Sequence, residues 1–415
     1  MKFRTITAFS LIAGFAAAPV IAQIGPAQRD EPPKPAPVTQ TGTPSVHVSP
    51  KASKAIADLQ TAVKNKDYAS VPAKVAAANA VASTSEDRYV IGKLQMVAAV
   101  AANDNAGVAA GLDAVAASGH ADPQLESYYV ALGGRYAEAK QFPQASAAFQ
   151  KALALNPRDT EAMRLLGVSE FQAGQKAEAA GQFEKLIQAS TAAGQKPSED
   201  LYRLAVQSAF DAKSPEALTL SQQWVAAYPS PDSWENSIAV YRGVRQPDAE
   251  SEVDLFRLLA ATGALRKPNE YALYIERAGE KNNWNEARAA LDAATSANVI
   301  NATDPTYHNL VSIVRSRQPA TAADLATAAK TAASGTALIG IGDRYYAMGD
   351  YARAVETYRS AIGKAGVDPA IANLHIGMAL ARSGDKAGAT AALNSVTGPR
   401  SDVAKYWLIY VNQKA

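Results

Sequence analysis

The 415-residue chain contains no cysteine and only four histidines. The absence of cysteine excludes disulfide bonds, thiolate metal sites, a cysteine nucleophile and a lipid-modified N-terminal cysteine. Neither of the metal-binding or hydrolase strings H-E-x-x-H and G-x-S-x-G is present. None of the four histidines has the spacing of a ligand or a catalyst: His47, His120, His308 and His375. We therefore predict no catalytic, cofactor-binding or metal-ligating residues.

The chain also lacks an excess of charge of either sign and has few aromatic residues. Two of its 41 basic residues lie in the first 22 positions, which leaves 39 basic against 39 acidic residues in the rest. This balance gives no reason to expect binding to nucleic acid. Aromatic residues make up only 7% of a chain that is 48% hydrophobic, so alanine supplies much of the apolar content. Alanine is the best helix former, and strand-like alternation is nearly absent, which predicts an all-α fold.

The N-terminus has the composition of an export signal. Lys2 and Arg4 precede the apolar run Ile6–Ala18, and small residues lead to an expected cleavage after Ala22. The run is too short for a convincing membrane span, so we expect a periplasmic or secreted chain without an integral membrane segment once the signal is removed. An uncleaved amphipathic start is the alternative. Residues 23–50 are proline-rich and predict a disordered linker, either a plain spacer or a docking strip.

A 34-residue helical-hairpin pattern covers Glu126–Asp159. Two apolar stripes with helical spacing flank a break at residues 140–143, and the second stripe ends at Pro157. Within the stripes, small residues alternate with large ones, so two antiparallel helices can approach closely: Tyr129, Leu132, Gly133 and Tyr136 in the first, and Ala145, Phe149 and Ala152 in the second. A hairpin of this size cannot bury both faces alone and must stack on others of its kind.

The same pattern recurs along the chain. Its small and large positions return in four further units: Leu166, Gly167, Ala179 and Phe183; Leu204, Ala205, Ala217 and Trp224; Ile341, Gly342, Ala354 and Tyr358; Ile376, Gly377, Ala389 and Leu393. Weaker units fit by helix length near Asp232, Pro268 and Asp304, and two further helical pairs fit Ala52–Thr84 and Glu86–Gly119. The repeat therefore extends over the whole region after the linker.

These residues resemble the tetratricopeptide repeat family. The resemblance implies a right-handed α-solenoid of stacked helix pairs with a C-terminal capping helix, and a function in binding. The expected organisation is 1–22 signal peptide, 23–50 linker, 51–125 degenerate helical repeats, 126–230 repeats, 231–334 degenerate repeats, 335–400 repeats and 401–415 capping helix.

The resemblance also implies where a partner binds, because the first helix of each unit lines the concave surface in this family. The residues expected to face that groove are Arg164, Val168, Phe171, Tyr202, Val206, Phe210, Ile339, Asp343, Tyr346, Leu374, Met378 and Arg382. The basic clamp with which some relatives hold an acidic peptide end is not reproduced, since Val130, Gly134 and Val168 occupy its positions. A segment with apolar side chains is the better-supported ligand.

Three functions are open on the sequence alone. The first is a non-catalytic periplasmic scaffold or adaptor that binds a protein or peptide partner in the cell envelope. The second is an accessory factor of polysaccharide export, cell-wall or outer-membrane assembly, in which Trp224, Trp234 or Trp284 stacks on a glycan, although core packing explains these residues equally well. The third and least favoured is an enzyme built on a helical solenoid, for which no set of candidate residues exists.

Overall fold

The structure is a computed structural model that describes residues 47–413. The expected signal peptide and all but the last four residues of the expected linker lie outside this range. The described residues fold into α-helices and short connections, and they contain no strand, which confirms the all-α prediction. Within residues 47–413, no helix has both the length and the apolar character that crossing a membrane requires.

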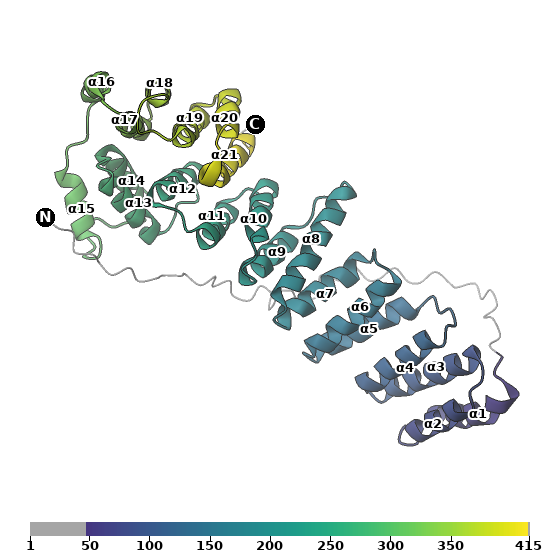
Figure 1. Cartoon of the computed structure of the whole chain (residues 1–415). Coiled ribbons are helices and arrows are strands. Elements are labelled where there is room, and N and C mark those ends of the chain that lie inside the picture. The colour runs from purple at the N-terminus through teal and green to yellow at the C-terminus, as the bar shows by residue number, and fades with distance from the viewer. Residues whose placement is uncertain (1–46, 414–415) are drawn as a thin grey trace.

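The helices follow one another as a stack of hairpins that runs across Figure 1. The stack begins with α1 (Pro50–Lys64), α2 (Val71–Val81), α3 (Ser85–Ala101), α4 (Asn105–Ala117), α5 (Leu125–Glu138), α6 (Phe142–Leu155), α7 (Thr160–Gln172), α8 (Lys176–Ala192), α9 (Glu199–Asp211) and α10 (Glu216–Ala227). It continues with α11 (Pro231–Arg245), α12 (Ala249–Thr262), α13 (Pro268–Glu280), α14 (Trp284–Ser296), α15 (His308–Ser316), α16 (Ala322–Thr331), α17 (Gly335–Ala347), α18 (Tyr351–Ala361), α19 (Pro369–Ser383), α20 (Lys386–Asn394) and α21 (Ser401–Gln413).

Short polar residues start many of these helices. The side chain of Thr84 accepts a hydrogen bond from the backbone N–H of Asp87, and the Asp87 carboxylate accepts one from the backbone N–H of Thr84. Asp159 caps α7 in a similar way, because its carboxylate accepts from the N–H groups of Glu161 and Ala162. These bonds satisfy backbone donors that have no partner inside a helix, and they fix where each hairpin begins.

Inside a hairpin, a glycine of the first helix receives a large side chain of the second. A Cβ atom added at Gly133 would lie 2.5 Å from the Phe149 ring, and one added at Gly167 would lie 2.8 Å from the Phe183 ring. Both rings are fully buried. Only glycine permits this approach, so the small and large positions that repeat in the sequence are the two sides of one contact.

The hydrophobic core is divided differently in the two halves of the chain. Between Ala52 and Val240, three separate clusters of buried side chains follow one another along the stack, and each joins neighbouring hairpins. From Leu218 to Val411, one continuous cluster holds almost all the buried apolar side chains. The N-terminal half is therefore a linear stack, and the C-terminal half is closed on itself, as the curled end of the ribbon in Figure 1 shows.

Helix α21 closes the C-terminal half. We expected a helix that covers only the end of the stack, and α21 does contact α19 and α20, the last hairpin. It also contacts α10 and α12 in the middle of the chain. The hydroxyl of Tyr406 donates to the backbone oxygen of Ser237 at 3.0 Å, and Gln413 donates to the oxygen of Val225 at 2.7 Å. The terminal helix thus contacts residues of the middle of the chain that precede it by more than 150 positions in the sequence.

Candidate partner-binding groove

The resemblance places the first helices of the hairpins on the inner side of the curve. Consecutive first helices contact one another at α5 and α7, at α13 and α15, and at α17 and α19. We take the surface of these first helices as the candidate inner surface.

The structure buries seven of the twelve residues that we expected to face an open groove. Their side chains lie in the hydrophobic core or in a buried ion cluster and do not form a free surface: Tyr202, Val206, Ile339, Asp343, Tyr346, Leu374 and Met378. Tyr202 and Val206 pack between neighbouring first and second helices in the core around α8 to α10. Of the five on α17 and α19, four belong to the continuous core cluster of the C-terminal half, and Asp343 belongs to a buried ion cluster.

Helix α12 contacts two of these five residues, Asp343 and Tyr346. Arg257 of α12 lies 3.4 Å from the carboxylate of Asp343 on α17, and its guanidinium is 5.1 Å from the centre of the Tyr346 ring. Asp254 of α12 lies 3.1 Å from the imidazole of His375 on α19. The inner surface of the last two full hairpins is therefore filled by the chain itself. This corrects the expectation that α17 and α19 present an open groove to a partner.

The contact between α12 and these helices is built on five ionisable side chains that are at most 7% exposed: Asp254, Arg257, Glu286, Asp343 and His375. The guanidinium of Arg257 donates to both carboxylate oxygens of Glu286, at 2.6 and 2.7 Å, and to Asp254 at 3.1 Å. Three neutral groups complete the cluster: Tyr274 and Asn283 donate to Glu286 at 2.6 and 2.7 Å, and Tyr358 donates to Asp343 at 2.8 Å. We call these residues the buried ion cluster.

The charges in the buried ion cluster hold one another in the ionised state. Burial by itself disfavours the imidazolium form of His375, but the carboxylates of Asp254 and Asp343 outweigh burial and raise the pKa of His375 to about 10. Burial likewise opposes ionisation of Asp343, and Arg257 with His375 holds the pKa of Asp343 well below its usual range. Two cations thus face three carboxylates in a medium of low polarity, where each pair interacts strongly.

Sequence reasoning missed this cluster. The available signal was the pair Asp254 and Arg257, three residues apart in a helix whose other neighbours are valine, leucine and phenylalanine. Charged residues flanked on all sides by apolar ones in a helix tend to be buried in a paired state. Asp248, which precedes the same helix, has a different role, because it caps α12 by accepting from the N–H of Ser251.

The remaining expected residues keep exposed surface. Arg164, Val168 and Phe171 on α7 and Phe210 on α9 are half-buried, and the last three pack against the cluster around α8 to α10. Arg382 on α19 is also half-buried, and its guanidinium donates to the hydroxyl of Tyr351 at 3.2 Å. We call the four residues on α7 and α9 the inner strip.

The inner strip is apolar at its centre and carries charge at its edges. The rings of Phe171 and Phe210 rest against the core below α7 to α9. The ammonium group of Lys176 lies 3.1 Å from the centre of the Phe171 ring, and it donates to the backbone oxygen of Phe171 at 2.9 Å. Burial lowers the pKa of Lys176. At the other edge, Arg164 pairs with Glu161 at 2.6 Å. Such a strip accepts apolar side chains and offers polar contacts beside them.

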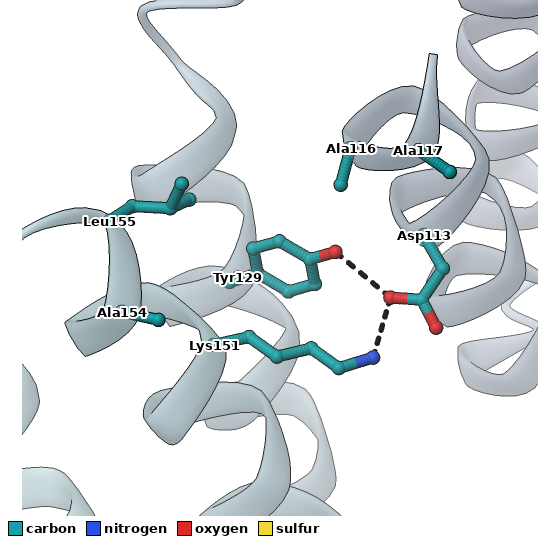
Figure 2. A pocket seen from close by; sticks show the side chains of 7 residues that line it. All are labelled: Asp113, Ala116, Ala117, Tyr129, Lys151, Ala154 and Leu155. Carbon is teal, nitrogen blue, oxygen red and sulfur yellow. Dashed lines mark hydrogen bonds and ion pairs between the residues drawn. The ribbon is translucent and has the colours of Figure 1, made fainter. Parts of the chain in front are cut away.

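A separate hollow of about 410 Å³ lies between the second helices α4 and α6, with Tyr129 of α5 at its floor. Figure 2 shows the Tyr129 hydroxyl and the Lys151 ammonium converging on one carboxylate oxygen of Asp113, at 2.8 and 2.5 Å. Its other lining residues are small or apolar: Ala116, Ala117, Ala154 and Leu155. The three polar groups are thus engaged with one another. Among residues 47–413, no three acidic or histidine side chains are placed to hold a metal ion.

Comparison with known proteins identifies the repeat. Residues 130–194 and 339–403 match the sequence model of the tetratricopeptide repeat. Both segments cover hairpins in which the glycine-to-large-residue contact is present. The search among curated proteins finds no match.

Three solved structures are similar over most of this chain. A tetratricopeptide repeat protein from Parabacteroides merdae has 12% identity and a TM-score of 0.27, covering 78% of this chain and 99% of its own. The TPR2AB domain of yeast Sti1, solved in complex with pHSP90, has 13% identity and a TM-score of 0.26, covering 70% and 100%. The Cut9–Hcn1 hetero-tetramer of APC/C has 12% identity and a TM-score of 0.20, covering 88% and 90%.

Proposed function

We propose that this chain, a tetratricopeptide repeat protein, is a non-catalytic periplasmic scaffold or adaptor that binds an envelope partner through the inner strip of its N-terminal half. Members of this repeat family bind protein or peptide partners. The inner strip supports the proposal because it is the part of the expected groove where aromatic and basic side chains keep exposed surface. The export signal read from residues 1–22 supports the location.

The partner chemistry follows from the composition of the inner strip. Phe171 and Phe210 offer apolar contact, while Arg164 and Lys176 are each already engaged by Glu161 or by a ring and a carbonyl. A highly acidic ligand would have to displace these contacts. An extended or helical segment with apolar side chains at regular spacing needs no such displacement, so this is the ligand that we propose.

The test uses the full exported chain with a photo-crosslinking amino acid at Val168, in the inner strip, and at Leu155, on the outer surface. We expect a discrete crosslinked envelope protein from position 168 and not from position 155. Replacing Phe171 with alanine should weaken the crosslink, since half-buried aromatic anchors carry much of the energy of such interfaces. The matched control Leu155→Ala removes an apolar side chain that is 50% exposed, and it should leave the crosslink from position 168 unchanged.

Two outcomes would contradict the assignment of the inner strip as the binding surface. One is crosslinking from position 168 that persists unchanged in a folded Phe171→Ala variant. The other is equal capture from both positions, which would indicate non-specific contact. Retained helical signal and an unchanged melting temperature identify a variant as folded.

The glycan-binding alternative has less support. Trp224 and Trp234 are only 3% and 2% exposed and belong to the core, so neither ring is free to stack on a sugar. Trp284 is half-buried, with Gly279 against one side of its ring and the guanidinium of Arg317 4.9 Å from its centre.

A further inference from the structure

The apolar core of the N-terminal half is interrupted at α7. One cluster of buried apolar side chains ends with Leu166 of α7, and the next begins with Ala179 of α8. Of the residues buried in α7, which is described over its whole length, only Leu166 has a large apolar side chain, and the buried set includes Ser169 and Glu170. The contact between the hairpin α5–α6 and the hairpin α7–α8 therefore contains a buried carboxyl group as well as apolar side chains.

Glu170 occupies a repeat position where two other first helices carry tyrosine. This position lies three residues after the small residue that receives the second helix, and it holds Tyr136 in α5 and Tyr345 in α17. Each tyrosine hydroxyl donates to a backbone oxygen at the start of the preceding second helix, at 3.1 and 3.3 Å. Glu170 is 2% exposed, and its Oε2 atom has no hydrogen-bond partner within residues 47–413. Ionising such a carboxyl group costs free energy, because burial removes its hydration without a full set of replacement bonds.

The groups around Glu170 do not compensate its charge. Burial is the largest influence and raises the pKa of Glu170 to about 7; a hydrogen bond from Gln150 of α6 and the charge of Lys185 oppose this shift, and the charge of Glu178 adds to it. Ser146, one turn before Gln150 on the same face of α6, is also buried, and its hydroxyl has no partner among the described residues. The other charged side chains of α5 to α8 are Glu126, Arg135, Glu138, Lys151, Glu161, Arg164, Lys176 and Glu184.

A second proton-dependent contact joins α5 to the start of α7. The side chain of Glu126, in the first turn of α5, shares a hydrogen bond with that of Asp159, the N-cap of α7. Two carboxyl groups share a hydrogen bond only when one of them holds a proton. Asp159 accepts from the N–H groups of Glu161 and Ala162 and so remains ionised, and its hydrogen bond raises the pKa of Glu126. Raising the pH therefore breaks this contact as well.

From these observations we infer that the junction between the hairpins α5–α6 and α7–α8 is a proton-dependent hinge, closed when Glu126 and Glu170 hold protons and open when both are ionised. Opening hydrates the Glu170 carboxylate and releases Glu126 from Asp159, at the place where the apolar core is interrupted. It changes the angle between residues 47–155 and the hairpins that follow. The inference does not depend on the inner strip being a binding site.

The first test measures the angle at the hinge through a distance. Because the chain has no cysteine, spin labels can be placed on the full protein at Val97→Cys and Thr219→Cys, two exposed positions on opposite sides of the junction. We expect the distance distribution to shift or broaden between pH 5 and pH 8. A Glu126→Gln/Glu170→Gln variant should keep the pH 5 distribution at pH 8. The control pair Gln188→Cys and Thr219→Cys lies on one side of the junction and should give the same distribution at both pH values.

The second test is hydrogen exchange, because α6 and α7 lose tertiary support when the junction opens. The protonated form of Glu170 stabilises the closed state fully below its ordinary pKa near 4.5, and this contribution is lost as the pH rises through 7. Protection factors in 142–172 should therefore fall about tenfold or more between pH 5 and pH 8, while those in 199–227 stay constant. Glu170→Gln should remove most of this fall.

Ser208→Ala is the matched control. Ser208 holds the same repeat position in α9 and is fully buried, and its hydroxyl has no partner among the described residues, but it does not ionise. This variant should keep the full pH dependence in 142–172. Distance distributions that are identical at both pH values in the unmodified chain would overturn the inference. A fall in protection that persists in Glu170→Gln, or one spread evenly over residues 47–227, would do the same. If the double variant does not fold, the single Glu170→Gln and Glu126→Gln variants decide the question by the same measurements.

Discussion

Replacing Arg257 with methionine tests the energetic role of the buried ion cluster directly. The guanidinium is 4% exposed and contacts three carboxylates, of Glu286, Asp254 and Asp343, at 2.6 to 3.4 Å. Methionine keeps much of the volume and removes the charge. The cluster then holds three carboxylates and one cation, so its net charge changes from −1 to −2 in a buried site. Breaking a buried pair in this way costs about 3–5 kcal/mol, because the remaining charges have lost their compensation.

The chain offers a specific probe for this half. Three of the four tryptophans, Trp234, Trp284 and Trp407, lie in or against the C-terminal core cluster, and Trp224 lies in the neighbouring cluster, so tryptophan fluorescence reports mainly on the C-terminal half. We expect urea unfolding, followed by fluorescence, to show that Arg257→Met lowers the free energy of unfolding by about 3–5 kcal/mol. The matched control Arg353→Met breaks an exposed pair in the same half and should cost about 0–1 kcal/mol. If both variants lower the free energy of unfolding by the same small amount, the view that the buried ion cluster stabilises the closed C-terminal half would be refuted.

The pH dependence gives a second readout of the same reasoning. The pKa of His375 is raised to about 10, so its stabilising contribution is complete below its ordinary pKa near 6.5 and is lost as the pH rises toward 10. The pKa values of Asp254 and Asp343 are lowered, so their contributions are present above the ordinary range near 4 and are lost in acid. The unmodified protein should therefore be less stable at pH 10 than at pH 6. A flat profile between these values would contradict the assigned pairing of His375.

Two further changes test the N-terminal half, with helical circular dichroism as the readout. Gly133→Ala should lower the free energy of unfolding by about 1–3 kcal/mol, because the added Cβ would lie 2.5 Å from the Phe149 ring. In the control Gly134→Ala the added Cβ meets open space, so this variant should be neutral or stabilising by up to about 1 kcal/mol. Equal effects of the two variants would refute the contact between Gly133 and Phe149. Burial raises the pKa of Glu170 to about 7, so the ionised carboxylate destabilises the folded protein as the pH rises from 4.5 through 7. Glu170→Gln should therefore stabilise the protein by about 1–2 kcal/mol at pH 8 and have no effect on stability at pH 4. A stabilisation of the same size at both pH values would show that ionisation is not the cause.

Much of the fold could be predicted because the contacts that define each repeat join residues that lie close together in the sequence. A glycine in one helix and a large residue about 16 positions later, as in Gly133 with Phe149 and Gly167 with Phe183, define a hairpin contact that needs no knowledge of the rest of the chain. Helix starts such as Asp159 are equally local, since the side chain bonds to its own next turn. The inner strip was partly predictable for the same reason, because its residues follow from their place within a repeat.

The sequence by itself determined an all-α stack of hairpins and the helix faces that meet within each hairpin, because those contacts join residues only a few turns apart. Only the tertiary structure decided that the C-terminal half closes on itself. The contact of Asp254 with His375 and that of Arg245 with Asp402 join residues more than 120 positions apart, and no period in the sequence relates them. The curvature that brings them together is the sum of small rotations between successive hairpins, and that sum decided that Asp343 lies in a buried ion cluster instead of an open groove.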